Sequence, residues 1–147
     1  MGLLIAVSVI VLLLSALCSG TEAALFSISD VKVKARAEEG SSSAEALKTI
    51  QSDMSRPIAA IVILNNIANI TGSMLIGKIA AEQLGTWEGV FSGVFTFAVI
   101  VCAEIIPKTF GERYSDPIAF WIAKPVLLLT KSFLILLWIV ELFTRPF

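Results

Sequence analysis

Residues Val101 to Lys108 read V-C-A-E-I-I-P-K and place a carboxylate, a proline and a cation at the close of an apolar segment. A charged side chain at bilayer depth costs about 3 kcal/mol by the lower estimates and usually faces a bundle interior, a water-filled path or a bound ion. If this segment spans a membrane, the cost of placing Glu104 there must therefore be offset by one of these surroundings. It is the first candidate for a functional residue.

The composition around this stretch is that of a membrane protein. The chain has 147 residues, of which 56% are hydrophobic and 16% are charged, and its mean hydropathy is +0.88. The net charge of -1 does not favour a nucleic-acid partner. Histidine is absent, and Cys18 and Cys102 lie in apolar runs, so a bound metal would need oxygen ligands. Oxygen ligands suit magnesium, calcium, sodium or manganese.

Residues 3–28 form the first predicted transmembrane helix, because Glu22 is the only charged residue in this stretch. A helix rises about 1.5 Å per residue, so this length crosses a hydrocarbon core of about 30 Å with some tilt. A cleaved signal peptide is the alternative. It is disfavoured because no basic residue precedes Leu3 and because Leu17 stands where cleavage requires a small residue.

Residues 29–56 are polar and basic, and Gly40 with the serines after it divides them into two short helices. We expect a cytoplasmic helical hairpin here, because basic residues next to a span mark its inner side. The N-terminus should then lie outside the cell membrane. The basic residues are Lys32, Lys34, Arg36, Lys48 and Arg56.

Two further spans follow, over residues 57–83 and 87–109, separated by a short turn that contains Gly85. Trp87 is placed to anchor the turn at the outer interface. Lys108 and Arg113 then mark the cytoplasmic side again. The basic residues at both ends of this pair therefore agree with an N-terminus outside.

Residues 117–143 allow two arrangements. The stretch is long and apolar enough to span, but it contains Lys131 and Glu141 and is flanked by Arg145. A fourth span would carry Arg145 outside, whereas a helix along the inner interface keeps these charges in contact with water. The chain ends at Phe147 without a soluble domain, as a piece of a longer protein would.

Polar residues in the three spans fall at similar depths. Counted inward from the cytoplasmic ends, these residues all lie in the inner to middle part of the bilayer. Three antiparallel helices can therefore bring them together, and the helical spacing adds Ser15 and Glu22 to the face of Ser19. The residues of matching depth are Ser19, Asn65, Asn69 and Glu104.

Pro107 gives the opening stretch a second oxygen ligand. A proline within a helix removes the hydrogen bond to the carbonyl four residues earlier, which is that of Ala103. Unpaired backbone at membrane depth is tolerated only where another group satisfies it. Gly20 is expected to loosen the first helix beside Ser19 in the same way.

The simpler interpretation is that the Ser and Asn side chains only hold helices together, each contributing about 1 kcal/mol or less. That interpretation suits any one of them taken singly. Three asparagines, two carboxylates and a helix broken by proline are more than packing requires, so the set as a whole favours an ion site. No nucleophile and base pair and no phosphate-binding loop occurs in the sequence, so an enzyme is not expected.

Three motifs together resemble the transmembrane domain of the cyclin M and CorC (CNNM/CorC) magnesium transporter family. They are Ser19-Gly20-Thr21-Glu22-Ala23-Ala24-Leu25-Phe26-Ser27, Leu64-Asn65-Asn66-Ile67-Ala68-Asn69, and Glu104-Ile105-Ile106-Pro107-Lys108 followed by Arg113-Tyr114. Each is weak alone, but their order and spacing agree over nearly the whole chain. One departure is Ala103, where the family commonly has glycine.

The resemblance implies an all-α homodimer that exports Mg2+ with Na+ coupling. Each protomer would have three transmembrane helices, the cytoplasmic hairpin and a juxtamembrane belt helix over residues 117–143, and the rest of the protein would carry cytoplasmic CBS modules. By the same resemblance, the metal ligands would be Ser19, Asn65, Asn69, Glu104 and the Ala103 carbonyl. Nearby polar residues of secondary role would be Glu22, Ser27 and Asn66.

The expected function is therefore that of a multi-pass magnesium transporter domain in the cell membrane, with its C-terminus in the cytoplasm. The alternative is a membrane-embedded Mg2+ sensor or adaptor that regulates another transporter without moving ions. Flux through the purified protein in liposomes separates the two.

Overall fold

The structure is a computed structural model that describes residues 1–144, and all regular structure in this range is helical. The predicted all-α class is confirmed. The elements are α1 (Gly2–Ser27), α2 (Asp30–Glu38), α3 (Ser42–Ser52), α4 (Ser55–Leu84), the 3-10 turn η1 (Gly85–Trp87), α5 (Glu88–Ala98), the π-helix η2 (Val99–Ile105), α6 (Ile106–Arg113), α7 (Ser115–Ser132) and α8 (Leu134–Thr144).

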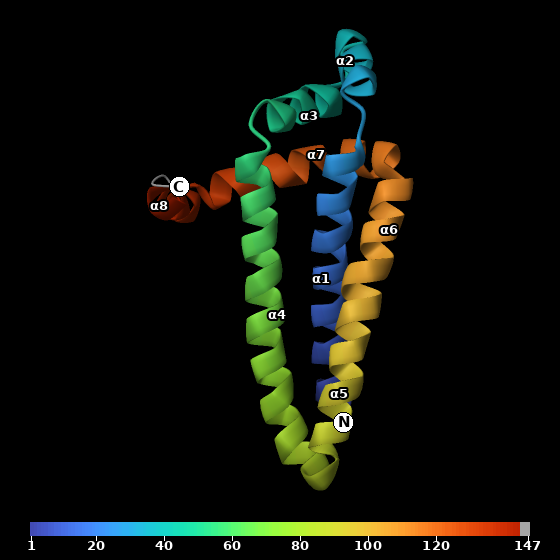
Figure 1. The fold of residues 1–147 in the computed structure, drawn as a ribbon, viewed down its shortest axis with the longest axis vertical. Helices are drawn as coiled ribbons and strands as arrows, with labels where there is room; N and C mark the ends of the chain where they lie inside the picture. Colours follow the sequence, from blue (N-terminus) through green and yellow to red (C-terminus); the bar gives the residue numbers. More distant parts are fainter. Residues whose placement is uncertain (145–147) are drawn as a thin grey trace.

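Three long rods make up most of the molecule (Figure 1). The rods are α1, α4 and the continuous run α5–η2–α6, and α1 packs against both of the others. Two helical runs among the described residues are long and apolar enough to cross a membrane, namely Gly2–Ser27 and Ser55–Arg113. The second run reverses direction at η1, so it supplies two antiparallel rods.

The reversal depends on Gly85, whose φ of 53° lies in the left-handed region. Residues with a Cβ rarely adopt that conformation, which explains the glycine at this position. We call this extremity of the rods the η1 end, and we call the opposite extremity, where α7 lies, the α7 end. The third rod continues past the predicted boundary at Thr109 to Arg113.

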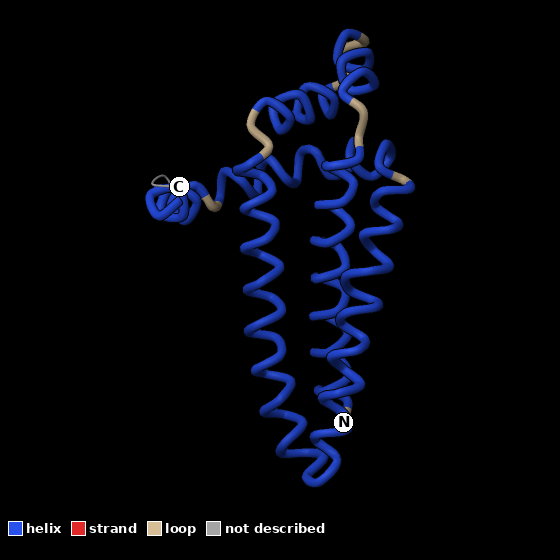
Figure 2. Tube along the Cα trace, viewed as in Figure 1, coloured by secondary structure: helices blue, strands red, loops and turns tan. Residues whose placement is uncertain are grey.

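The short helices gather at the α7 end. Helix α7 runs across the ends of the rods, and α2 and α3 lie beyond it, joined by the loops seen in Figure 2. A buried apolar cluster joins α1, α2, α3 and α7 at this end. It includes Leu25, Val33, Leu47, Ile50 and Ala119, so the polar segment after α1 is folded onto the rods through its apolar face.

The segment predicted as one helix over residues 117–143 is two helices, α7 and α8, bent by 69°. The sequence-based expectation of a single helix here was wrong. The hydroxyls of Thr130 and Ser132 donate to the carbonyls of Val126 and Leu128, at 2.8 Å and 2.9 Å. Such hydroxyl bonds to the preceding turn bend helices, and they lie directly before the break at Phe133.

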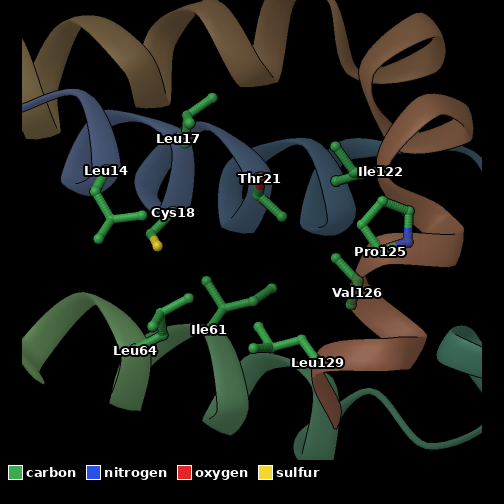
Figure 3. Close-up of a pocket in the computed structure, with 10 residues that line it drawn as sticks. All are labelled: Leu14, Leu17, Cys18, Thr21, Ile61, Leu64, Ile122, Pro125, Val126 and Leu129. Carbon is green, nitrogen blue, oxygen red and sulfur yellow. The ribbon is translucent and has the colours of Figure 1, made fainter. Parts of the chain in front are cut away.

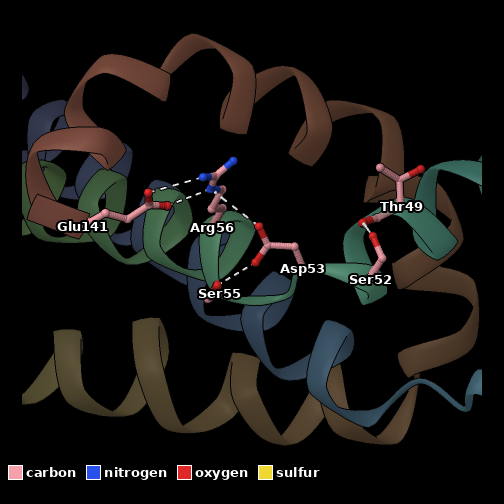
Figure 4. A network of polar contacts seen from close by, with 6 residues as sticks. All are labelled: Thr49, Ser52, Asp53, Ser55, Arg56 and Glu141. Carbon is pink, nitrogen blue, oxygen red and sulfur yellow. Dashed lines mark hydrogen bonds and ion pairs between the residues drawn. The ribbon is translucent and has the colours of Figure 1, made fainter. Parts of the chain in front are cut away.

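Helix α8 is tied back to the start of α4 by a polar network (Figure 4). The Nε of Arg56 donates to Oε1 of Glu141 at 2.7 Å, and Nη2 donates to Oε2 at 3.3 Å. The same guanidinium lies 3.5 Å from Asp53 Oδ2. These contacts fix α8 against the rods on the far side of the bend.

Candidate ion site

The centre of the candidate site is a polar contact between α1 and α4. The Nδ2 of Asn69 donates to Ser15 Oγ at 3.1 Å and to Asn65 Oδ1 at 3.3 Å. Ser15 is fully buried, and the two asparagines are half-buried. The structure therefore brings the predicted residues Asn65 and Asn69 together and joins them to the first rod.

Two oxygen atoms at this level have no hydrogen-bond partner. They are Ser19 Oγ and Asn69 Oδ1, and both are buried. Buried polar atoms in proteins are nearly always paired, because an unmade hydrogen bond leaves the desolvation cost uncompensated. Both of the lone oxygens can accept a cation. They come from adjacent rods, and Ser19 lies one helical turn from Ser15.

On the third rod, the predicted ligands Glu104 and Ala103 lie within η2. This π-helix packs against α1, Ala103 is fully buried and Glu104 is half-buried. Hydrogen bonds here run five residues back, as from the Ile106 N–H to the Val101 carbonyl. Pro107 has no N–H, so it leaves an acceptor without its helical donor: Ala103 in α-helical spacing, Cys102 in the spacing of η2.

Helix α1 continues through Gly20 without a break, so the expected loosening of the helix is not observed. Gly20 instead allows a close approach of the third rod. A Cβ added to it would lie 3.3 Å from the Pro107 carbonyl oxygen, and one added to Gly111 would lie 2.3 Å from the Gly20 carbonyl oxygen. The two backbones therefore touch, and Pro107 lies against Gly20, the residue that follows Ser19.

The secondary polar residues divide into two groups. Glu22 and Ser27 line a cavity of about 160 Å³ between α1 and α6, together with Lys108 and Glu112. Asn66 is exposed on α4. The structure thus gathers Glu22 and Ser27 at the α7 end of the site and leaves Asn66 outside it.

The acidic residues do not form a metal cluster by themselves. Within residues 1–144, no three His, Cys, Asp or Glu side chains are grouped as they would be around a metal ion. A cation at this level would depend on hydroxyl, amide and backbone oxygens with Glu104 as the acid. Such a donor set suits a hard cation and does not suit a soft one.

A larger pocket of about 260 Å³ lies between α1, α4 and α7 (Figure 3). Its lining is almost entirely apolar, so it offers no ligand set for a cation. The residues that line it are Leu14, Leu17, Cys18, Thr21, Ile61, Leu64, Ile122, Pro125, Val126 and Leu129.

Ser15 is the residue that sequence reasoning placed on the right face without giving it a part in the site. Its hydroxyl oxygen accepts a hydrogen bond from Asn69 Nδ2, and Asn65 Oδ1 accepts a second hydrogen bond from the same nitrogen. The serine spacing along the first span was a signal for it, because Ser15 and Ser19 are one turn apart on one helix face.

Membrane-length helices that enclose buried hydroxyl and amide oxygens define an α-helical membrane domain. Residues 6–147 match the family model described as the cyclin M transmembrane N-terminal domain. The chain belongs to this family, and the resemblance seen in its three motifs is confirmed.

Named relatives in several organisms match almost the whole chain. It is 51% identical over 145 residues to a UPF0053 protein of Synechocystis, covering 98% of this chain and 42% of that protein. It is 31% identical over 137 residues to the UPF0053 inner membrane protein YfjD of Escherichia coli, covering 90% and 31%. A chloroplastic DUF21 domain-containing protein of Arabidopsis thaliana is 29% identical over 126 residues, covering 85% and 19%. The chain spans less than half the length of each relative.

Proposed function

We propose that this domain binds one Mg2+ between its three rods and exports it across the membrane by alternating access, with Na+ as the coupling ion. The ligands are Ser19, Asn65, Asn69, Glu104 and the Ala103 carbonyl. The observation that carries the proposal is the pair of buried, unpartnered oxygens, Ser19 Oγ and Asn69 Oδ1, on adjacent rods.

The hydrogen bonds of Asn69 leave its oxygen free to bind a cation. Its amide nitrogen donates to Ser15 and Asn65, so its oxygen is turned away from those two contacts with its lone pairs unused. Only a hydrogen-bond donor or a cation can satisfy that oxygen. Mg2+ prefers six oxygen ligands at about 2.0 to 2.1 Å and usually keeps several of its waters.

The low charge of the ligand set favours transport over permanent storage. Glu104 supplies a single negative charge against the two positive charges of Mg2+, and the other ligands are neutral. Ion affinity depends on the number of charged ligands, and a transported ion must bind weakly enough to leave. Na+ competes for the same oxygens in this scheme.

The distribution of basic residues supports an orientation. Of the Lys and Arg residues within 1–144, only Lys78 lies toward the η1 end, and the others lie in α2, α3, α6, α7 or at the start of α4. Basic residues beside spans mark the cytoplasmic side. The α7 end is therefore cytoplasmic in our proposal, with the α2–α3 hairpin inside the cell, the N-terminus outside, and α7 and α8 along the inner interface of the cell membrane.

The rods also present large exposed apolar side chains, such as Ile70 and Met74 on α4 and Val94 and Phe97 on α5. In the proposed arrangement these faces contact lipid or the second protomer of a homodimer. The remaining length of the protein would supply the cytoplasmic CBS modules that regulate the domain.

The test uses the purified full-length protein, with Mg2+ binding measured by isothermal titration calorimetry and flux measured in liposomes with a Mg2+ indicator. We expect Glu104→Gln and Asn69→Ala to lower the affinity and the flux at least tenfold. Asn66→Ala is the matched control, because Asn66 is an exposed asparagine on the same helix. Wild-type binding and flux in Glu104→Gln would exclude the proposed site.

The wild-type protein decides between transport and sensing. Flux in liposomes that contain no other protein supports a transporter. Tight Mg2+ binding without flux would instead support the sensor or adaptor.

A further inference from the structure

A third buried oxygen without a partner lies outside the proposed site. It is the Oγ of Ser8, in the half of α1 that leads to the η1 end, and Ser8 is only 9% exposed. Other helical hydroxyls of the described chain, including those of Thr96, Thr109 and Thr130, donate to the carbonyl four residues earlier. Ser8 makes no such bond, so its hydroxyl is available within the packed interior.

Ser8 is in line with the site along one face of α1. Ser15 and Ser19 follow it by 7 and 11 residues, and at about 100° per residue both offsets bring the side chain back to within about 20° of the same line. At about 1.5 Å per residue, Ser8 lies about 16 Å from Ser19 along the helix axis. The buried hydroxyls thus continue from the site toward the η1 end.

The register between α1 and α4 sets the surroundings of Ser8. Ser15 accepts a hydrogen bond from Asn69, and Val11 fits against Gly72, where an added Cβ would lie 2.4 Å from Val11 Cγ2. The same antiparallel register brings Ser8 level with Ile76. The buried apolar cluster at this level consists of Leu4, Val11, Ile76, Ile79 and Ala80.

This cluster separates the proposed site from the η1 end. The cluster is packed and apolar, and a strongly hydrated cation cannot enter such a region without water or polar ligands. The contact of Val11 with Gly72 holds α1 close to α4 here. A separation of the two helices at this contact would let water reach the Ser8 hydroxyl.

We propose that Ser8 is a transit ligand for the hydrated divalent cation in the outer half of the path, and that the Leu4, Val11 and Ile76 side chains around it form the outer gate. The hydroxyl replaces part of the water shell as the ion passes the opened gate. This inference rests on the proposed function, because it supplies the exit from the site of Ser19 and Asn69.

Cysteine accessibility tests the gate. In the full-length protein with Cys18→Ala and Cys102→Ala, Ser8→Cys is exposed to a membrane-impermeant cationic thiol reagent added outside intact cells. We expect the labelling rate to rise at least fivefold in Mg2+-loaded cells compared with Mg2+-depleted cells. Thr86→Cys in η1 is the control, because Thr86 is exposed at the η1 end of the rods; its rate should not depend on Mg2+. A Ser8→Cys rate that is unaffected by Mg2+ overturns the gate.

Flux and binding test the transit ligand separately. Ser8→Ala should lower the Mg2+ flux in liposomes about tenfold and leave the Mg2+ affinity within twofold of wild type, whereas Ser73→Ala, at an exposed position on α4, should alter neither. Full flux in Ser8→Ala overturns the role of Ser8. If Asn69→Ala keeps wild-type binding, the proposed site itself fails; if Asn69→Ala loses binding while Ser8→Ala keeps full flux, only the present inference fails.

Discussion

Asn69 combines a packing role and a ligand role in one side chain. Its nitrogen makes two hydrogen bonds and its buried oxygen makes none. The two donor contacts restrict the rotation of the amide, so the oxygen is presented in one direction before any ion binds. A ligand held in place in this way loses less conformational entropy on binding than a freely rotating one.

Ser15 is a positioning residue for that amide, and we expect Ser15→Ala to weaken Mg2+ binding. Removing a group that orients a metal ligand typically costs about 10- to 100-fold in affinity. The measurement is calorimetric titration of Mg2+, with the thermal stability of the variant recorded in parallel. Ser92→Ala, at an exposed position on α5, is the control. Unchanged affinity in Ser15→Ala would show that Asn69 is oriented without it.

Gly111 is required by the contact between the first and third rods. A Cβ at this position would lie 2.3 Å from the backbone oxygen of Gly20, which has no flexible side chain to move aside. We expect Gly111→Ala to destabilise the domain by about 1 to 3 kcal/mol, as overpacking of a close contact does. Reversible unfolding in mixed detergent micelles measures this change.

The control for that experiment is Gly93→Ala. Gly93 is also helical, but a Cβ there would have no atom within 4 Å. The higher helix propensity of alanine predicts a small gain in stability, up to about 1 kcal/mol. Equal destabilisation by both substitutions would contradict the packing argument for Gly111.

At the scale of the element, η2 is where local stability and the proposed function oppose each other. The rod stays helical through Val99–Ile105 but changes to five-residue hydrogen bonding just before Pro107. π-Helical turns are rare, appear mostly as single turns inside α-helices, and occur frequently at functional sites. The irregular turn includes the buried Ala103 and also Glu104.

Replacing Pro107 should separate the stability of the helix from its role in Mg2+ binding. Pro107→Ala restores an N–H and removes the ring, and a proline within a helix costs about 3 kcal/mol. We therefore expect a more stable protein with at least tenfold weaker Mg2+ binding, because the freed carbonyl regains a donor. Pro125→Ala, also within a helix but in α7, should raise stability and leave binding unchanged. A Pro107→Ala protein that binds Mg2+ as tightly as wild type would exclude the Ala103 carbonyl as a ligand.

For the whole molecule, hydropathy and charge predicted the helical class and the long rods. Lipid and a dry core both select apolar residues, so those signals do not depend on the details of packing. Residue counting also predicted a common depth for Ser19 and Asn69. The hydrogen bond from Asn69 to Ser15 depends on the rotation of α4 about its axis, which residue counting does not determine. The bend at Phe133 depends on the hydrogen bonds that the Thr130 and Ser132 hydroxyls donate to the preceding turn. The apolar composition of the segment does not predict these bonds.

The orientation of the whole domain gives the last prediction. The basic residues crowd the α7 end, so the positive-inside rule predicts that this end is cytoplasmic. In the background of Cys18→Ala and Cys102→Ala, Ser42→Cys in α3 should react with an impermeant thiol reagent only after the cells are permeabilised. Thr86→Cys in η1 should react in intact cells, because both positions are exposed but lie at opposite ends of the rods. The reverse pattern would place the N-terminus inside, and the proposed direction of export would then have to be reversed as well.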